Sequence, residues 1–436
     1  MTRVDAFDLP VRAAGDAALD AYRRGVEAML TANAGADTAL AEALAHDPGF
    51  ALAHAALARH HQLNARLEAA RASIARAGEL VAATEMRERQ HVNVLALAIG
   101  GQGAAAFDAL RAHMDDYPRD AIVLSLALGV YGLIGFSGRV DHHAEQRRLL
   151  EGLQPCWPED GWFLGYLGWV QAETGEPALG AATVRRGLAL KPRNANAAHG
   201  LTHAYVELGA SDAGYGFLAP WVADYDRAGL LHCHLNWHLA LYELDRGQQD
   251  GARQRFREAI QPDRALAPPM PVLADAASFL WRCRLYAPAD GDLPWPDVAA
   301  LVARVFPSSG LAFADLHAAM AEAATGNAAS LERRVAALDQ RAAGGSLPPG
   351  RVIPTLCRAV AAYAAGDDGE TIALIEQALP DLPRIGGSHA QREVFEDTLI
   401  AACLRAGRHP RARALLQERL ARRPREQDRR WLAAVT

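Results

Sequence analysis

A spacing of about 34 residues recurs along this chain and constrains its fold more than any other feature. In residues 161–194, a Leu-Gly pair stands seventh and eighth, a glycine fifteenth and a proline thirty-second; these are Leu167, Gly168, Gly175 and Pro192. Small residues at fixed positions let two helices approach closely, and proline cannot continue the helix that precedes it. This unit therefore predicts two packed helices joined by a turn at Gly175.

The same frame returns before and after that unit. Matching glycines, alanines or prolines occur in residues 87–120, in the unit that follows them, and in 233–266, 352–385 and 393–426. A degenerate early unit ends near Pro48. This pattern is typical of tetratricopeptide repeats, which stack because one unit cannot bury its apolar face alone. The sequence predicts an all-α solenoid of tetratricopeptide-like helix–turn–helix repeats, and leaves open whether it closes around a central groove.

Composition supports one helical domain over the whole chain, residues 1–436. Half of the residues are hydrophobic but only 7% are aromatic, and alanine and leucine, which favour helix, dominate. No β-hairpin signal and no phosphate-binding glycine loop is present. The stretches "QPDRALAPPMPVLAD" and "RAAGGSLPPGRVIPT" predict an irregular, loop-rich insertion at about 262–350.

Charge and cysteine content exclude several classes of function. The formal net charge of −6 gives no attraction to nucleic acid or to an anionic membrane. No run of about 18 apolar residues is present to span a bilayer. Five scattered cysteines without a C-x-x-C pair argue against disulfides and against a thiolate zinc site. Since the N-terminal stretch also lacks the apolar segment of a signal peptide, we expect a soluble cytoplasmic protein.

The only basic run of the sequence begins at Arg419, in "RLARRPREQDRRW". Its arginines alternate with apolar and acidic residues, as they do on the solvated face of an amphipathic helix. We therefore expect a terminal helix with its arginines in solvent, and no binding arm for nucleic acid.

Two pairs of histidines lie four residues apart on successive units. His199 and His203 stand in "NAAHGLTHAYVELG", and His234 and His238 stand in "LLHCHLNWHLALYELDRG". Residues four apart share one helical face, with Cβ atoms about 5–6 Å apart, so both rings of a pair could reach one ion. The repeat frame places both pairs on first helices, which line the groove and lie about 8–10 Å apart. The four histidines are therefore the predicted metal ligands.

The chemistry of these residues limits the cofactor. Imidazole suits iron, copper and zinc, and Glu173, which the frame also places in the groove with His91, would favour iron or zinc. "HGLTH" carries a glycine where zinc peptidases have their catalytic glutamate, which argues against a peptidase. Haem held between two facing histidines stays open. So does a structural interpretation, in which the histidines bind one another or a peptide carboxylate.

Most other histidines receive no role from the sequence. His142 and His143 are adjacent and point to different faces of a helix, while His113 and His389 have no partner at helical spacing. We therefore do not assign any of these four residues to a site.

Two further stretches carry reactive groups at helical spacing. "LADAASFLWRCRL" places Asp275, Ser278 and Arg282 on one helical face, where an ordinary surface ion pair is the competing interpretation. "LAFADLHAAMAEAATG" places Asp315 and His317 just upstream of a turn marked by glycine, a combination that is common by itself.

The stretch "RIGGSHAQREVFEDTLIAA" predicts the start of a helix. Ser388 is expected to be its N-cap, because serine side chains accept hydrogen bonds from the first free amides of a helix. Those amides, together with Arg392, could also bind a carboxylate or a phosphate. N-capping is the simpler of the two predictions, because it needs only the Ser388 side chain and no bound anion.

Several of these stretches resemble the tetratricopeptide repeat protein 38 family, which includes StaR-like bacterial members. They are "CHLNWHLALYELDRG", "FADLH", "DAASFLWR" and "GGSHAQREVFEDTLI", and the resemblance covers about residues 40–425. It implies site residues at His54, His91, Glu173, His199, His203, His234, Trp237, His238, Asp275, Ser278, Arg282, Asp315, His317, Gln391 and Arg392. Glu393, where the family leads us to expect aspartate, and Tyr205, where some members have histidine, depart from it.

Together these features predict a metal-dependent enzyme with oxidative chemistry on an amino-acid-like or other small molecule, using iron, copper or zinc. The metal ligands are His199, His203, His234 and His238. The predicted catalytic residues are Glu173, His91, Asp315 and His317. The predicted substrate-binding residues are Arg282, Arg392, Asp275, Trp237 and His54, since a guanidinium suits a substrate carboxylate. The alternative is a non-catalytic scaffold that binds a peptide or protein partner in the groove.

Overall fold

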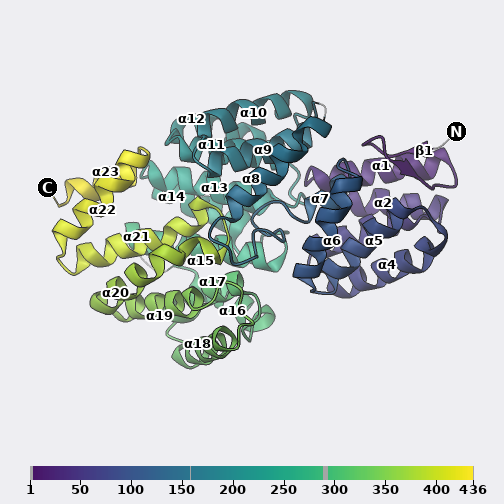
Figure 1. Cartoon of the computed structure of the whole chain (residues 1–436). Coiled ribbons are helices and arrows are strands. Elements are labelled where there is room, and N and C mark those ends of the chain that lie inside the picture. Colours follow the sequence, from purple (N-terminus) through teal and green to yellow (C-terminus); the bar gives the residue numbers. More distant parts are fainter. Residues whose placement is uncertain (1–2, 158, 288–292, 436) are drawn as a thin grey trace.

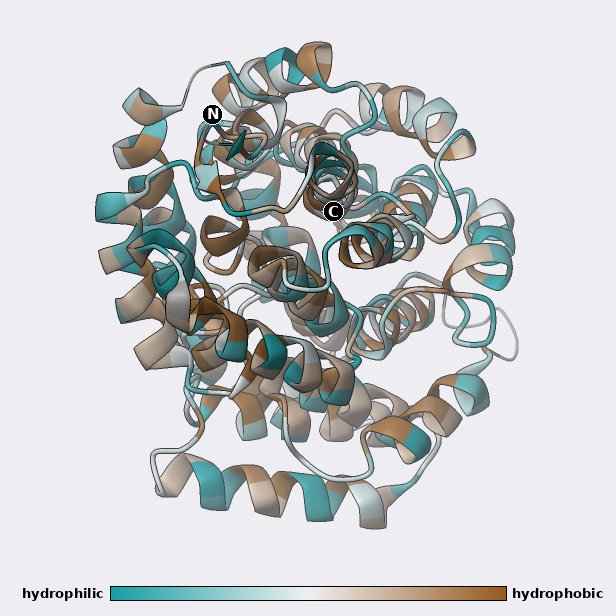
Figure 2. Ribbon diagram, turned by 90° about the vertical axis from the view of Figure 1, so that its right-hand side faces the viewer, coloured by the Kyte–Doolittle hydropathy of each residue, from teal (hydrophilic) through white to brown (hydrophobic). Residues whose placement is uncertain are grey.

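The chain forms an all-α solenoid of helix–turn–helix units, as the sequence predicts (Figure 1). This computed structural model describes residues 3–157, 159–287 and 293–435. Within them the chain contains twenty-three α-helices and a single pair of two-residue strands. Figure 2 shows brown and teal residues on the same helical turns, as expected for helices with one buried face.

The strand pair at the N-terminus is a departure from the sequence prediction, which contained no hairpin. Strands β1 (Arg3–Val4) and β2 (Pro10–Val11) pair antiparallel. The loop between them is held by Asp5, whose Oδ1 accepts hydrogen bonds from the backbone amides of Phe7 and Leu9. The Asp5 side chain thus takes the place of the turn residues that normally indicate a hairpin in a sequence.

The first six helices form three regular helix–turn–helix units: α1 (Asp16–Leu30) and α2 (Ala36–His46), α3 (Ala51–Leu63) and α4 (Leu67–Leu80), and α5 (Met86–Ile99) and α6 (Gly103–Asp116). The unit expected next is incomplete. Its first helix, α7 (Ala121–Ser125), has five residues and is followed by turns up to α8 (His142–Leu153). Gly129 and Gly138 adopt positive φ angles there, a conformation that interrupts a helix.

The central units match the predicted frame closely. They are α9 (Gly161–Glu173) and α10 (Pro177–Leu190), α11 (Ala195–Glu207) and α12 (Ser211–Ala223), and α13 (His232–Asp245) and α14 (Gln249–Arg255). The small residue predicted at Gly168 is required, because a Cβ atom there would lie 2.4 Å from Val184 and 2.6 Å from the Gly180 carbonyl oxygen. Pro192 follows the end of α10, as predicted.

The segment expected to be a loop-rich insertion is largely helical in its described part. It contains α15 (Pro269–Tyr286), α16 (Trp295–Val305), α17 (Ala312–Ala324) and α18 (Ala328–Ala343). Prolines stand at the first or second position of α15 and α16, where a missing amide costs nothing. The prolines that suggested loops therefore begin two helices.

The last units contact the central part of the solenoid. They are α19 (Val352–Ala365) and α20 (Asp368–Ala378), then α21 (His389–Arg405) and α22 (His409–Arg422), followed by α23 (Glu426–Ala433). Helix α21 packs on α15, where Trp281 Nε1 donates a hydrogen bond of 3.0 Å to Thr398 Oγ1. Gln391 also reaches Tyr131 in the turn region before α8, at 3.3 Å. The groove is therefore closed by α21 at this level.

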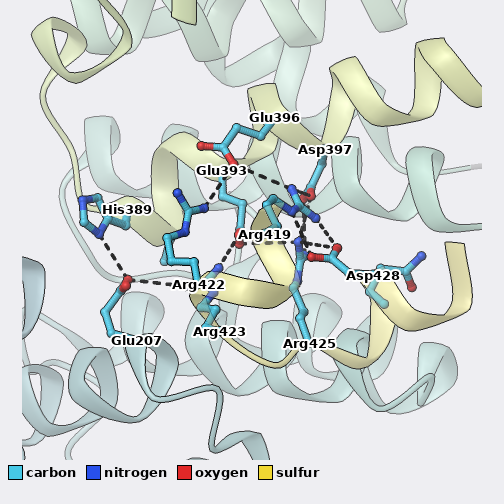
Figure 3. Close-up of polar contacts among 12 residues, drawn as sticks. Glu207, His389, Glu393, Glu396, Asp397, Arg419, Arg422, Arg423, Arg425 and Asp428 are labelled. Carbon is cyan, nitrogen blue, oxygen red and sulfur yellow. Dashed lines mark hydrogen bonds and ion pairs between the residues drawn. The ribbon is translucent and has the colours of Figure 1, made fainter. Parts of the chain in front are cut away.

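Two of the terminal arginines are buried, which corrects the prediction for them, whereas Arg422, Arg429 and Arg430 are exposed as expected. Arg419 and Arg423 are only 5% and 7% exposed. They form ion pairs with Glu393, Asp397, Asp428 and Glu207, as Figure 3 shows together with Arg425. Because arginine presents a planar fork of donors, it can satisfy several carboxylates at once inside a protein.

None of the described helices combines the length and the apolar character needed to cross a bilayer.

Candidate metal centre

The four histidines predicted as ligands meet between α11 and α13. His199 and His203 lie on one turn of α11, and His234 and His238 on one turn of α13. Each residue contributes one ring nitrogen to a group of four, all within 4.8 Å of one another. The convergence of the two pairs on one point, which a shared metal ion requires, is therefore met.

His199 lies in the middle of this group, named here the four-histidine centre. Its Nε2 is 2.8 Å from Nε2 of His203 and 3.1 Å from Nε2 of His234. The rings of His199 and His203 have centroids 4.4 Å apart, and those of His234 and His238 are 4.8 Å apart. Three of the residues are buried and His199 is partly exposed, which makes His199 the least buried member of the centre.

Two carboxylates on neighbouring helices fix the protonation of two rings. Glu173, at the end of α9, accepts a hydrogen bond of 2.8 Å from Nδ1 of His203. Asp275, on α15, accepts one of 2.9 Å from Nδ1 of His234. Since a carboxylate only accepts, Nδ1 carries the proton, and in the neutral ring Nε2 keeps its lone pair. Both lone pairs point toward the centre, an arrangement usual for histidines that bind metal.

His238 completes the group with two nitrogens that have no hydrogen-bond partner among the described residues. Its side chain is 1% exposed, so water does not readily replace such a partner. Burial, reinforced by His203, His234, His199 and Arg282, holds the pKa of His238 well below its usual range. Burial likewise lowers the pKa of His199, with His203 and His234 adding to the effect. Both rings are therefore neutral at pH 7 and able to donate a lone pair.

The spacing fits a transition-metal ion after a small adjustment. Metal–nitrogen bonds of about 2.1 Å in a tetrahedron place the nitrogens about 3.4 Å apart. The separations of 2.8 and 3.1 Å around His199 are a few tenths of an ångström shorter. A single N–H on His199 cannot serve both neighbouring lone pairs with good geometry. The donor set therefore fits a metal better than it fits a network of hydrogen bonds.

Helix α15 contacts two residues of α13 through Asp275 and Ser278. Trp237 is fully buried, stacks on His234 with ring centroids 5.1 Å apart, and donates a hydrogen bond of 3.1 Å to Ser278 Oγ. Asp275, predicted to bind substrate, instead holds His234. Burial, with Asp275 close by, raises the pKa of the Cys233 thiol well above its usual range, so this thiol stays protonated.

Glu173 connects the centre to α21. Its Oε2 accepts a hydrogen bond of 2.9 Å from the backbone amide of His389, the first residue of α21. The predicted N-cap at Ser388 is confirmed, and Gln391 completes a capping box with it. The helix start that was expected to bind a carboxylate thus holds one from the protein itself. Burial opposes ionisation of Glu173, but His389, His203 and His143 outweigh it and hold its pKa well below the usual range.

The two arginines predicted to bind substrate have partners within the protein. Arg282 donates through Nη2 to the Ala390 carbonyl oxygen at 2.6 Å, and its Nε lies 3.6 Å from Asp397. Arg392 donates through Nη1 to the carbonyl oxygens of Gly386 and Gly387, just before α21. Each arginine therefore helps to anchor α21 against the rest of the solenoid.

Two predicted catalytic residues have their partners elsewhere in the fold. His91 donates through Nδ1 to Asp120 at 2.9 Å, and His113 also contacts this carboxylate, at 3.1 Å. Arg87 forms an ion pair with the same carboxylate. Because the guanidinium already neutralises Asp120, this second group of histidines is less suited to a cation than the four-histidine centre. His91 shares the groove frame with His203, but the incomplete unit after residue 120 separates their environments.

Three more predicted site residues also make local contacts. Asp315 forms a buried ion pair of 2.6 Å with Arg334 of α18. His317 donates through Nδ1 to the Phe313 carbonyl oxygen at 2.7 Å, and burial lowers its pKa to about 4. The ring of His54 lies 3.1 Å from the Pro48 carbonyl oxygen. These contacts link neighbouring turns and helices, so the structure gives each residue a packing role independent of the centre.

Two histidines that sequence analysis left without a role lie beside Glu173. His143 Nδ1 is 3.5 Å and His389 Nδ1 3.8 Å from Glu173 Oε2. They come from α8 and α21, far apart in sequence, so no helical spacing links them. The one signal in the sequence was the predicted anion-binding helix start at Ser388, which places His389 next to a carboxylate.

Comparisons with known proteins give a loose likeness of fold and no family. No protein-family model matches the chain. Solved structures similar to it include a monomeric mutant of IFIT1 with Gppp-AAAA, at 12% identity and a TM-score of 0.42 over 98% of this chain and 96% of that one. The TPR domain of P58(IPK) matches at 14% identity and 0.24 over 90% and 89%, and yeast Tom70 at 14% and 0.27 over 93% and 99%. TM-scores this low carry no conclusion about function.

Proposed function

We propose that the four-histidine centre binds a divalent transition-metal ion and that the chain is a metal-dependent enzyme acting on a small molecule. One observation carries this proposal: the Nε2 lone pairs of His203 and His234 converge while Glu173 and Asp275 hold their Nδ1 protons. Imidazole donors suit iron, copper and zinc. A bound ion would supply Lewis acidity or electron transfer to a substrate oxygen or nitrogen.

The residues of the chain prepare the centre for such an ion. Glu173 and Asp275 orient two rings and increase the basicity of their free nitrogens. His199 and His238 are kept neutral by burial, so neither must lose a proton before it binds. Four neutral ligands leave the charge of a divalent ion undiminished, which favours an anionic substrate group next to it.

A small substrate fits this site better than a peptide. Helix α21 lies against Glu173 and α15, so an extended chain cannot pass along the inner face at this level. The partly exposed edge of His199 is the side from which a substrate reaches the centre. An amino-acid-like substrate and oxidative chemistry are the specific form we propose, supported by the resemblance to the tetratricopeptide repeat protein 38 family. Five free cysteines support a reducing compartment such as the cytoplasm.

Elemental analysis of the purified full-length chain tests the proposal. We expect at least one iron, copper or zinc per chain, and one equivalent fewer in the His203→Ala/His238→Ala double variant. His46→Ala is the matched control, because His46 is an exposed histidine at the end of α2. A metal content that is the same in the double variant as in the wild type, or a wild-type chain that does not bind any of the three metals at micromolar concentration, contradicts the proposal.

A non-catalytic scaffold for a peptide or protein partner is the second candidate. The repeat architecture supports it, since helical solenoids present extended surfaces to partners. With α21 inside the groove, such a partner would use the outer helices, where Leu179 and Leu190 of α10 are 46% and 48% exposed. Replacing both leucines with glutamate would then abolish partner binding but leave metal binding unchanged, which separates the two functions.

A further inference from the structure

A second group of potential ligands lies on the far side of Glu173 from the four-histidine centre. It consists of His143 in the first turn of α8, Glu173 at the end of α9 and His389 at the start of α21. One ligand atom from each falls within 4.8 Å of the others. Glu173 thus uses Oε1 toward His203 and Oε2 toward this second group.

We propose that His143, Glu173 and His389 form a second site for a divalent transition-metal ion, with Glu173 shared between the two sites. The distances favour an ion between the three groups. The Nδ1 atoms of His143 and His389 lie 3.5 and 3.8 Å from Glu173 Oε2, too far for good hydrogen bonds. Ligands at about 2.1 Å from a tetrahedral ion are about 3.4 Å apart, close to these values.

The environment of His143 suits a metal ligand. Its side chain is 7% exposed, and its Nε2 has no hydrogen-bond partner among the described residues. Burial holds the pKa of His143 well below its usual range against the opposing effect of Glu173, so its ring is neutral at pH 7. The ring centroids of His143 and His389 are 5.8 Å apart, which leaves room for an ion between two coordinating nitrogens.

His389 gives this site access to solvent. Its side chain is 45% exposed, whereas Glu173 is fully buried. Nδ1 of His389 also lies 3.3 Å from Oε1 of Glu207, which Figure 3 shows between His389 and Arg423. Glu207 is itself paired with Arg423, so it adds little net negative charge near the proposed ion. Two imidazoles and one carboxylate with open positions are typical of iron(II) and zinc sites.

The charge of Arg392 opposes a cation here, but the local structure limits the effect. Its Nη1 is engaged by the carbonyl oxygens of Gly386 and Gly387 and lies 3.4 Å from His142 Nε2, not from His143. No ion pair of 4 Å or less joins Arg392 to a carboxylate within the described residues. Glu173 therefore balances the one guanidinium of Arg392, while Glu207 and Arg423 balance each other.

A shared carboxylate couples the two sites, and this coupling alone rests on the proposed function. An ion on Oε2 withdraws negative charge from Glu173 and weakens the hydrogen bond that His203 donates to Oε1. The basicity of His203 Nε2 then falls, because that hydrogen bond sustains it. We therefore expect an ion in the second site to lower the affinity of the four-histidine centre.

Metal titration of the chelator-stripped full-length chain tests the second site. With Zn²⁺ in isothermal titration calorimetry, and Co²⁺ absorption as a second readout, we expect two equivalents for the wild type. His389→Ala is expected to bind one equivalent, and so is the His199→Ala/His238→Ala double variant, while His46→Ala keeps two. His143→Ala repeats the loss seen for His389→Ala, and circular dichroism confirms that each variant folds.

The outcomes separate the two proposals. One wild-type equivalent that is lost in His199→Ala/His238→Ala and kept in His389→Ala overturns the second site. A bridging water would then occupy the space between His143, Glu173 and His389. One equivalent lost in His389→Ala but kept in His199→Ala/His238→Ala supports the second site and refutes the four-histidine centre. Binding of neither ion overturns both.

Discussion

Glu173 and His203 are joined by a hydrogen bond of 2.8 Å between Oε1 and Nδ1, and neither side chain has any exposed surface. The other oxygen of the same carboxylate accepts the backbone amide of His389 at 2.9 Å. One buried carboxylate thus connects α9 and α11 to α21, which lies far from both in the sequence. The group that orients a candidate metal ligand is also the group that closes the solenoid.

Replacing Asp275 with asparagine tests the orientation of His234 without touching Glu173. The amide accepts the Nδ1 proton more weakly, so the ring loses basicity and fixed orientation. We expect zinc affinity at the four-histidine centre to fall about 10–100-fold, as is usual when such a partner is removed. Competition with a fluorescent zinc chelator measures this. Asp212→Asn, at an 87% exposed carboxylate, is the matched control, and equal affinities for both variants would contradict the prediction.

Metal binding is expected to raise the thermal stability of the chain. A ligand that binds only the folded state adds about 2.7 kcal/mol to the free energy of unfolding at 100 times its dissociation constant. Differential scanning calorimetry with and without zinc measures the gain in Tm. The His203→Ala/His238→Ala double variant should show a clearly smaller gain than the wild type. An identical gain in both proteins would place the bound zinc elsewhere.

His317 is expected to make stability depend on pH. Burial lowers its pKa in the folded state to about 4, below an unfolded value of about 6.5, so the unfolded chain binds this proton first as pH falls. The stabilisation is fully present above about pH 6.5 and is lost toward pH 4, at roughly 1.4 kcal/mol per pH unit. Urea unfolding of wild type and His317→Leu between pH 7 and 4.5 measures it. We expect a shallower slope for the variant, and parallel slopes would contradict the assignment.

Arg423 is expected to stabilise the closure of the solenoid through Glu393 and Glu207 (Figure 3). Arg423→Ala leaves the buried Glu393 with one partner fewer, which costs about 3 kcal/mol of unfolding free energy. Arg422→Ala is the control, because Arg422 is 58% exposed and pairs with Glu396 at 3.3 Å. A surface pair contributes about 0–1 kcal/mol, so chemical denaturation should separate the two variants. Equal losses would show that burial of the ion pair is not decisive.

Gly209 and Gly175 provide a second test of closure. Both adopt positive φ angles, +62° and +91°, at equivalent turns between paired helices. A Cβ atom on Gly209 would lie 2.5 Å from the Pro424 carbonyl oxygen, whereas nothing lies within 4 Å of one on Gly175. Gly175→Ala is expected to cost about 1–2 kcal/mol from the backbone alone. Gly209→Ala should cost about 1–3 kcal/mol more from the clash, as measured by urea unfolding, and similar costs would place Pro424 away from this turn.

Local spacing predicted the part of this protein that depends on nearby residues. The positions of Gly168, Gly175 and Pro192 were enough to place α9 and α10, because helix packing and helix ends are governed within one repeat. The spacing of four between His199 and His203 fixed a shared face in the same way. The N-cap at Ser388 followed from chemistry within one turn of α21. Glycines after residue 120 interrupted the frame, since they adopt turns that a repeat count does not reveal.

Contacts between distant segments could be decided only by the tertiary structure. His389 has no partner at helical spacing, yet the return of α21 brings it to Glu173, 216 residues away. The sequence around Arg419 and Arg423 predicts an amphipathic helix with these arginines in solvent. Both are buried, because α21 supplies carboxylates that neutralise them. The sequence by itself determined the helices of the regular repeats and which of their faces carry histidine. Packing determined which carboxylate holds each ring, because side-chain partners depend on how the solenoid closes.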